Sequence, residues 1–220
     1  MNNLTLLIPA KHESGSLPLV LTELNEIDCK ILIVMEEEDF ETLESVKGFN
    51  VDILFQKNKG YGSALIEGIN KINTDFLCIF NADGSFRPSE LKSMFEKVQS
   101  HNFVFGTRYE KECSSEDDTF ITYIGNKIFT YIGKLFFRLT TTDILYTFVM
   151  GETILFKKLK LKENDFKICV EIPINIKKNN FLYINNKSNE RARFKGKKKV
   201  SEFMDGSKIL IYLIRRFFKF

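Results

Sequence analysis

Residues 76–85 read FLCIFNADGS, and this stretch decides how the rest of the chain is interpreted. Residues 76–80 are apolar enough for a buried strand, and Asn81, Asp83 and Ser85 follow at alternate positions where that strand should end. A turn after the strand would bring an amide, a carboxylate and a hydroxyl around one point. The stretch therefore predicts a strand that delivers a polar site to one edge of a sheet.

Two interpretations of this polar segment stay open from its residues alone. Converging oxygen atoms suit a divalent cation that keeps part of its water shell and also binds phosphate, as Mg²⁺ does, and Mn²⁺ accepts the same ligands. The alternative is an Asp-Gly turn that caps a following helix, predicted over residues 88–98. The position of the segment within the fold has to decide between them.

Strand-like and helix-like segments alternate on both sides of this stretch. Apolar runs predict strands at residues 4–8, 30–35, 51–55 and 76–80 and from residue 103. Helical spacing predicts helices at residues 17–27, after 36–39, and at 63–72, 88–98 and 120–139, whereas residues 149–156 and 169–176 fit either state. This alternation predicts an α/β fold with a mostly parallel central sheet flanked by helices. Ligands of such sheets bind beyond the carboxyl ends of the strands.

Length and composition set the limits of the fold. A chain of 220 residues with 44% apolar residues can bury one sizeable core. We expect one α/β domain over residues 1–202 and an amphipathic tail over residues 203–220. A net charge of +3 does not indicate a nucleic-acid-binding protein.

The cysteines and the first residues bear on the cellular compartment. The cysteines are widely separated and lack a metal-binding spacing, which is typical of reduced thiols in the cytosol: Cys29, Cys78, Cys113 and Cys169. The first residues lack the pattern of a signal peptide, and no apolar run reaches the roughly 18 residues of a membrane-spanning helix. We therefore expect a cytoplasmic protein.

A glycine-containing segment precedes the helix predicted at residues 63–72. Gly60 and Gly62 lie where backbone N–H groups and the helix dipole favour a phosphate or a hydroxyl-rich ligand. The segment matches neither the Walker loop nor the G-x-G-x-x-G fingerprint. An ordinary helix start is the alternative.

Two segments combine apolar and cationic residues. Residues 120–139 place one apolar stripe on a helix, made of Ile121, Ile124, Ile128, Tyr131, Leu135 and Leu139, and a cationic stripe of Lys127, Lys134 and Arg138. Residues 209–220, ILIYLIRRFFKF, pair the same two properties. Such helices are typical of proteins that lie on a membrane surface. Packing against the core or a second subunit is the alternative.

A basic run covers residues 187–199, with seven basic residues against Glu190 alone. A solvated loop or a patch that binds RNA would have the same composition. Binding of single-stranded nucleic acid usually needs several aromatic side chains, and this run offers Phe194 alone. We therefore expect no nucleic-acid partner.

Several segments occur in an order found in a known family: LIPAKHE, QKNKGYGSALIEGI, FLCIFNADGS, FGTRY, an Asp at TTTD, and ERARFKGKKKV followed by MDG. In this order they resemble the inverting family-two glycosyltransferases, most closely the polyprenol-phosphate sugar transferases of the dolichol-phosphate mannose synthase type. The resemblance covers roughly residues 4–206. It implies a GT-A (nucleotide-diphospho-sugar transferase) fold, a GDP- or UDP-sugar donor, Mg²⁺ or Mn²⁺, and a polyprenyl phosphate acceptor.

The resemblance also assigns roles to particular residues. It implies donor binding by Pro9, Ala10, Glu13, Glu36, Lys59, Gly60, Gly62, Asn81 and Ala82. It implies metal binding by Asn81, Asp83 and Ser85, and catalytic roles for Asp83, Arg108, Asp143 and Arg193. It implies that the acceptor phosphate is bound by Arg191, Arg193, Lys198 and Lys199.

The chain departs from the family pattern at Asn81, where a metal-binding Asp is usual. The amide keeps an oxygen ligand but removes a charge, so the metal would bind only together with the donor's pyrophosphate. The resemblance and this departure together leave three alternative functions. The chain transfers sugar to a polyprenyl phosphate at the cytoplasmic face of a membrane, transfers it to a soluble or polymeric sugar with Asp143 as the base, or is a non-catalytic membrane-associated subunit. A second copy of the chain or a membrane protein is a further expected partner.

Overall fold

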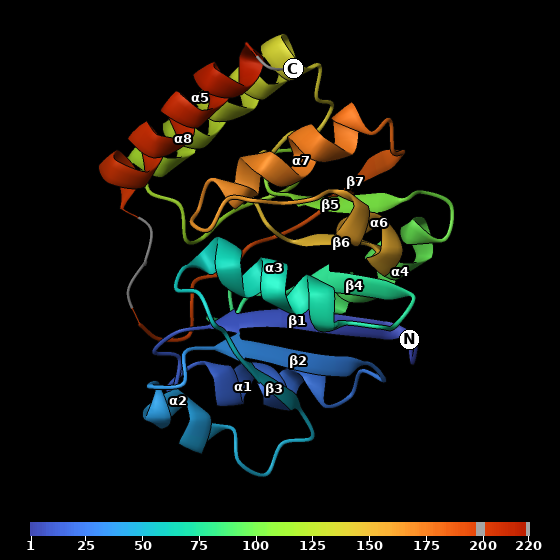
Figure 1. Cartoon of the computed structure of the whole chain (residues 1–220), viewed down its shortest axis with the longest axis vertical. Helices are drawn as coiled ribbons and strands as arrows, with labels where there is room; N and C mark the ends of the chain where they lie inside the picture. Colours follow the sequence, from blue (N-terminus) through green and yellow to red (C-terminus); the bar gives the residue numbers. More distant parts are fainter. Residues whose placement is uncertain (197–200, 219–220) are drawn as a thin grey trace.

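The central sheet of the protein has seven strands in the order β3-β2-β1-β4-β6-β5-β7 (Figure 1). The computed structural model describes residues 1–196 and 201–218, with nothing described for the side chain at 202. The strands are β1 (Leu4–Ala10), β2 (Lys30–Met35), β3 (Asp52–Phe55), β4 (Phe76–Ile79), β5 (Phe103–Thr107), β6 (Val149–Glu152) and β7 (Tyr183–Lys187). Parallel pairs join β1 to β2 and β4, β2 to β3, and β5 to β7, whereas β6 is antiparallel to both of its neighbours. The predicted mostly parallel α/β sheet is confirmed.

Helices cover both faces of the sheet and one end of it (Figure 1). Their bounds are α1 (Leu17–Leu24), α2 (Phe40–Ser45), α3 (Tyr61–Lys71), the short 3₁₀ helix η1 (Pro88–Glu90), α4 (Leu91–Val98), α5 (Phe120–Phe137), α6 (Thr153–Lys158), α7 (Ile168–Lys178) and α8 (Glu202–Phe217). In the described parts of the chain, none of these helices is both long enough and apolar enough to cross a membrane.

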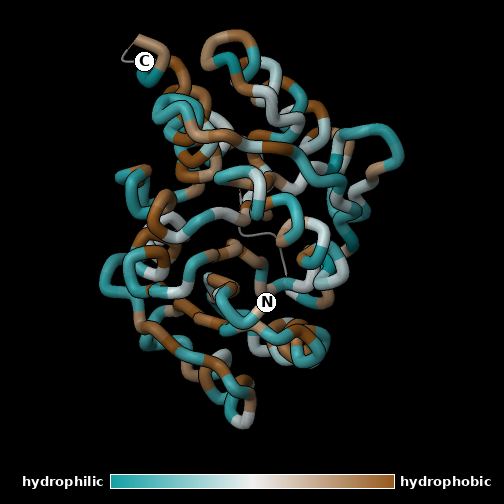
Figure 2. Tube along the Cα trace, turned by 90° about the vertical axis from the view of Figure 1, so that its right-hand side faces the viewer, coloured by the Kyte–Doolittle hydropathy of each residue, from teal (hydrophilic) through white to brown (hydrophobic). Residues whose placement is uncertain are grey.

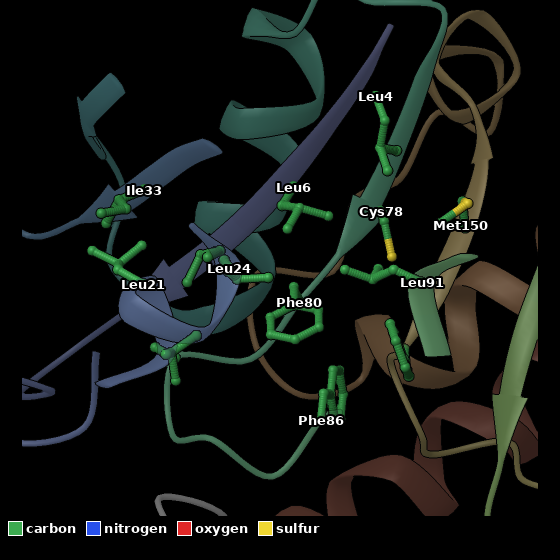
Figure 3. Close-up of a cluster of buried hydrophobic side chains, with 14 of the residues drawn as sticks. Leu4, Leu6, Leu21, Leu24, Ile33, Cys78, Phe80, Phe86, Leu91 and Met150 are labelled. Carbon is green, nitrogen blue, oxygen red and sulfur yellow. The ribbon is translucent and has the colours of Figure 1, made fainter. Parts of the chain in front are cut away.

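Alternation of side chains along the strands creates two cores. On β1, Leu6 and Ile8 face the cluster that α1 and α4 close, while Leu7 faces the cluster that α3, α6 and α7 close. Figure 3 shows the first cluster, in which Phe80 and Phe86 extend the packing beyond the end of β4. Their rings meet edge to face with centroids 5.6 Å apart. The start of the polar segment is therefore fixed by buried aromatic side chains.

Helices α5 and α8 lie side by side against α7 (Figure 1). A third cluster holds them there through buried side chains such as Phe137, Ile174, Ile209 and Leu213. Figure 2 shows hydrophobic stretches near the C-terminus, along this outlying part of the fold. The boundary between a domain and a tail near residue 202 stays a prediction.

The structure settles the elements that the sequence left open and corrects one helix end. Residues 149–156, which fit strand or helix, form β6 and then α6, and residues 169–176 lie within the helix α7. The helix predicted over 120–139 ends at Phe137, because Arg138 adopts a left-handed backbone conformation with φ 53°. Strand β7 was not predicted.

Candidate active site

A cavity of about 610 Å³ opens at the sheet edge where β1, β2 and β4 end. Its wall contains most of the predicted site residues, contributed by segments far apart in the sequence: Pro9, Ala10, Glu13, Glu36, Gly60, Asn81, Ala82, Asp83, Ser85, Arg108 and Arg193. Four predicted residues lie outside this wall: Lys59, Gly62, Asp143 and Arg191. Lys198 and Lys199 lie outside the described residues.

The segment after β4 turns tightly at Gly84, which has φ 85°. Asp83 Oδ1 accepts a hydrogen bond from the backbone N–H of Ser85 at 3.0 Å, and Asn81 Nδ2 donates to Ser85 Oγ at 3.3 Å. The turn therefore gathers the predicted amide, carboxylate and hydroxyl around one point. Asp83 Oδ2 faces the guanidinium of Arg193, whose Nη1 lies 3.7 Å away.

The described part of the basic run, residues 187–196, is held against this turn by its backbone. The N–H of Phe194 donates to the carbonyl of Asp83 at 2.8 Å, and the N–H of Arg191 donates to the carbonyl of Ser85 at 3.1 Å. The Phe194 ring lies so close to Gly84 that any side chain there would overlap it. The turn and the basic segment therefore form one unit.

Arg191 and Arg193 point to different partners within this unit. Arg191 donates to the carbonyl of Gly84 and to the Glu23 carboxylate. Its Cζ lies over the Phe194 ring, 4.4 Å from the ring centroid. Arg193 lines the cavity and makes two hydrogen bonds to Asp117, at 3.2 and 2.9 Å. Arg193 is therefore the arginine of this segment that a ligand in the cavity would meet.

Arg108 lies at the centre of a buried ion network. Its Nε and Nη2 donate to the two oxygens of Asp143 at 2.7 and 3.1 Å, and its Nη1 donates to Glu190 at 2.9 Å. Burial disfavours its charge, but Asp143 and Glu190 outweigh burial and hold the pKa of Arg108 well above its usual range. Burial also raises the pKa of Glu190, although Arg108 opposes this. Asp143 is fully buried, with both oxygens engaged by Arg108.

Another part of the cavity wall carries Glu36, which lies between two lysines. Lys11 Nζ lies 2.8 Å from one carboxylate oxygen, and Lys59 Nζ lies 3.8 Å from the other. The hydrogen bond from Lys11 is the main cause that lowers the pKa of Glu36. Lys59 does not line the cavity itself but contacts Glu36, which does. Lys11 also lines the cavity, although it was not among the predicted site residues.

Gly60 and Gly62 permit a close approach of the loop before α7. A side chain at either position would overlap the backbone carbonyls of residues 163–165, and Asn164 O accepts the N–H of Ser63 at 3.1 Å. This N–H group near the start of α3, which was expected to face a ligand, is therefore paired within the protein. The glycines serve backbone packing first, and Gly60 also lines the cavity.

We expect Gly62→Ala to lower the free energy of unfolding by about 2 kcal/mol, because the methyl group forces the loop away from α3. Gly125→Ala is the matched control. Its site within α5 has nothing within 4 Å of the added carbon, so this variant should gain roughly 1 kcal/mol of helix propensity. Urea unfolding of both variants measures the difference, and equal stabilities would show that the close approach is absent.

The cavity also contains residues that sequence reasoning missed. Asp117 and Asp118 come directly before α5, and an acidic pair at that place was the signal that could have found them. Tyr61 and Phe166 stack with ring centroids 5.1 Å apart in the apolar part of the wall. Cys169 lies nearby, and burial raises the pKa of its thiol to about 12, so it stays protonated at neutral pH.

The oxygen atoms of Asn81, Asp83 and Ser85 fit a divalent cation that shares its coordination with ligand phosphates. Asp83 contributes the one carboxylate of this turn. Among the described residues, the partner given for its Oδ2 is Arg193, whose Nη1 lies 3.7 Å away. In the part of the chain that the structure describes, no group of three or more His, Cys, Asp or Glu side chains could hold a metal by itself. The residues therefore fit a metal that depends on a bound ligand.

The chain is similar to known proteins in sequence and in fold. A family model described as Glycosyl transferase family 2 matches residues 5–164. A dolichol-phosphate mannosyltransferase of Saccharomyces cerevisiae is 26% identical over 118 residues, which are 48% of this chain and 44% of the yeast protein. The match thus spans less than half the length of that relative.

Solved structures confirm the predicted GT-A fold. A glucosyl-3-phosphoglycerate synthase of Mycobacterium tuberculosis, solved with Mn²⁺, UDP and glucosyl-3-phosphoglycerate, superposes with a TM-score of 0.75 at 10% identity, covering 97% of this chain and 79% of that one. A mannosyl-3-phosphoglycerate synthase of Rubrobacter xylanophilus superposes with a TM-score of 0.69 at 13% identity, covering 97% and 72%.

Proposed function

Since this chain belongs to glycosyl transferase family 2, we propose that it transfers a sugar from a nucleotide-diphosphate sugar to a polyprenyl phosphate, with inversion and with the help of Mg²⁺ or Mn²⁺. The donor part is supported by structural neighbours that bind UDP or UDP-glucose with Mn²⁺. The acceptor part is supported by the name of the yeast relative.

One observation carries the choice of acceptor: the cavity that contains Asp83 is also lined by α5 and α8. Thr122 and Asn126 of α5 and Ile209 of α8 belong to the same wall as Asp83 and Arg193. The cavity wall thus contains ionic groups and also reaches two helices that expose apolar faces elsewhere. An acceptor with a phosphate head and a hydrocarbon chain matches both features.

The exposed faces of α5 and α8 support binding to a membrane surface. The stripe predicted on α5 is exposed at Ile121, Ile124, Ile128, Tyr131 and Leu135, and only Leu139, beyond the helix, is buried. Helix α8 exposes Phe203, Met204, Leu210, Ile211, Ile214 and Phe217, and Phe218 is exposed directly after it. Cations accompany both faces, among them Lys134, Lys208 and Arg215. In this proposal the protein is peripheral, at the cytoplasmic face.

A phosphate acceptor would not need Asp143 as a general base. A phosphate monoester has a second pKa near 6 and is largely dianionic at neutral pH, so it can attack the sugar carbon without a general base. Asp143 has both oxygens occupied by Arg108 and does not line the cavity. In this proposal Asp143 holds Arg108 in place, and inversion follows from direct attack opposite the leaving diphosphate.

Charge at the leaving diphosphate is stabilised by groups on the turn and the basic segment. Asp83, with Asn81 and Ser85, would hold a cation, which supplies positive charge to the departing phosphates. Arg193 supplies a second positive charge on the same wall and reduces repulsion between the two phosphate groups. We place the nucleoside at Glu36, which has Lys11 and Lys59 beside it.

Calorimetric titration with UDP and with GDP, each with and without Mn²⁺, tests the donor site. We expect one nucleotide to bind in a metal-dependent way and thereby to identify the base. Absence of binding by both nucleotides under both conditions would favour a non-catalytic subunit that keeps the fold. The matched acceptor assay uses polyprenyl phosphate in vesicles and phosphoglyceric acid in solution, and transfer to phosphoglyceric acid alone would contradict the lipid acceptor.

A further inference from the structure

Arg193 lies between two carboxylates of the cavity. Two nitrogens of its guanidinium donate to Asp117, and the third, Nη1, lies 3.7 Å from Asp83 Oδ2. All three side chains are shielded from solvent, with exposed fractions of 20% for Arg193, 17% for Asp117 and 16% for Asp83. Interaction among these charges is therefore stronger than on an open surface.

The two oxygens of Asp83 have different partners. Oδ1 accepts the N–H of Ser85 and is held by the turn, whereas Oδ2 is the oxygen closest to Arg193. A cation coordinated by Asp83 would approach through Oδ2, where the guanidinium already supplies a positive charge. Arg193 and a divalent cation thus compete for the same oxygen.

We infer that Arg193 is a built-in counter-ion of Asp83, which a divalent cation must displace and which a bound diphosphate draws away. Asp117 keeps the displaced guanidinium on the cavity wall, within reach of phosphate oxygens. This inference rests on the proposed function for its ligands. Metal alone therefore binds weakly, and metal and nucleotide diphosphate bind together.

The exchange needs only a side-chain movement. Phe194 N–H holds the carbonyl of Asp83, and Arg191 N–H holds the carbonyl of Ser85, so the backbone on both sides of Arg193 is fixed to the turn. Removing the Arg193 side chain leaves these bonds in place. Its effect on metal binding can therefore be measured on a protein with the same backbone contacts.

The test is the affinity of the full chain for Mn²⁺ alone, measured from the electron paramagnetic resonance signal of free Mn²⁺. We expect Arg193→Ala to bind Mn²⁺ about fivefold more tightly than the unmodified protein, since one positive charge near 4 Å is removed. With UDP or GDP present, we expect the unmodified protein to bind Mn²⁺ more tightly than Arg193→Ala, because the variant lacks a cation that binds phosphate. Arg193→Lys keeps the charge and should stay within about twofold of the unmodified protein.

Lys195→Ala is the matched control, because it removes one positive charge from the same segment at an exposed residue outside the cavity wall. Unchanged Mn²⁺ affinity in Arg193→Ala, or equal tightening in Lys195→Ala, overturns the inference. If Arg193→Ala folds poorly, Arg193→Gln and the shift in melting temperature on adding Mn²⁺ give the same comparison. If Arg193→Ala binds Mn²⁺ more tightly but the unmodified protein transfers no sugar, this inference is supported and the proposed function is rejected. If the unmodified protein transfers sugar but Arg193→Ala binds Mn²⁺ with unchanged affinity, the proposed function is supported and this inference is rejected.

Discussion

Asp83→Ala is expected to lower sugar transfer by on the order of a thousandfold. Asp83 provides the one carboxylate of the turn after β4, and its neighbours Asn81 and Ser85 carry no charge. Without it, the cation that assists departure of the diphosphate loses its charged ligand. The rate of product formation with saturating nucleotide sugar measures the loss.

Asp52→Asn is the control for this substitution, because Asp52 is exposed on β3 and does not line the cavity. It should transfer sugar at the rate of the unmodified protein. Near-ultraviolet circular dichroism checks that both variants keep the native packing. An Asp83→Ala variant that retains its activity and its dependence on metal would show that the turn is only a structural feature.

The triple change Ile121→Gln, Ile128→Gln and Leu135→Gln is expected to weaken binding to anionic vesicles about a hundredfold. Each side chain lies on the exposed stripe of α5, and transferring it from water into lipid contributes about 1 kcal/mol when burial is partial. Three such losses amount to roughly 3 kcal/mol, or two powers of ten. Gln is a good helix former, so α5 itself should persist.

A matched triple change elsewhere separates membrane binding from general surface hydrophobicity. Phe40, Ile154 and Leu182 are as exposed as the α5 residues, but they lie on α2, on α6 and just before β7. Their replacement by Gln should leave sedimentation with vesicles containing phosphatidylglycerol unchanged. Equal losses in both variants, or no loss on α5, would contradict a membrane role for this face.

Much of the parallel half of the sheet could be predicted, because its strands are short apolar runs separated by helical spacing. Residues 30–35 form β2 as expected, and the helix predicted at 63–72 corresponds to α3. Strand β7 was not predicted, because its sequence, YINNK, has neither an apolar run nor a clear alternation of apolar and polar residues. It is a strand because it pairs with β5.

The candidate site could be predicted only where family-like segments end at the carboxyl edge of the sheet. Asp117 was missed because its partner Arg193 is 76 residues away, and periodicity contains no information about such pairs. The stripe on α5 was found from its spacing, but spacing does not tell which face of a helix packs inward. The inner contacts use Phe129, Ile132 and Phe137 instead.

The central claim is tested most directly by transfer of labelled sugar from UDP- or GDP-sugars to polyprenyl phosphate in vesicles, with Mn²⁺ and the purified protein. The account predicts a lipid-extractable labelled product from donors of one nucleotide base, absent when Asp83→Ala replaces the unmodified protein. Label that never enters the lipid phase, with every donor tried, would contradict it.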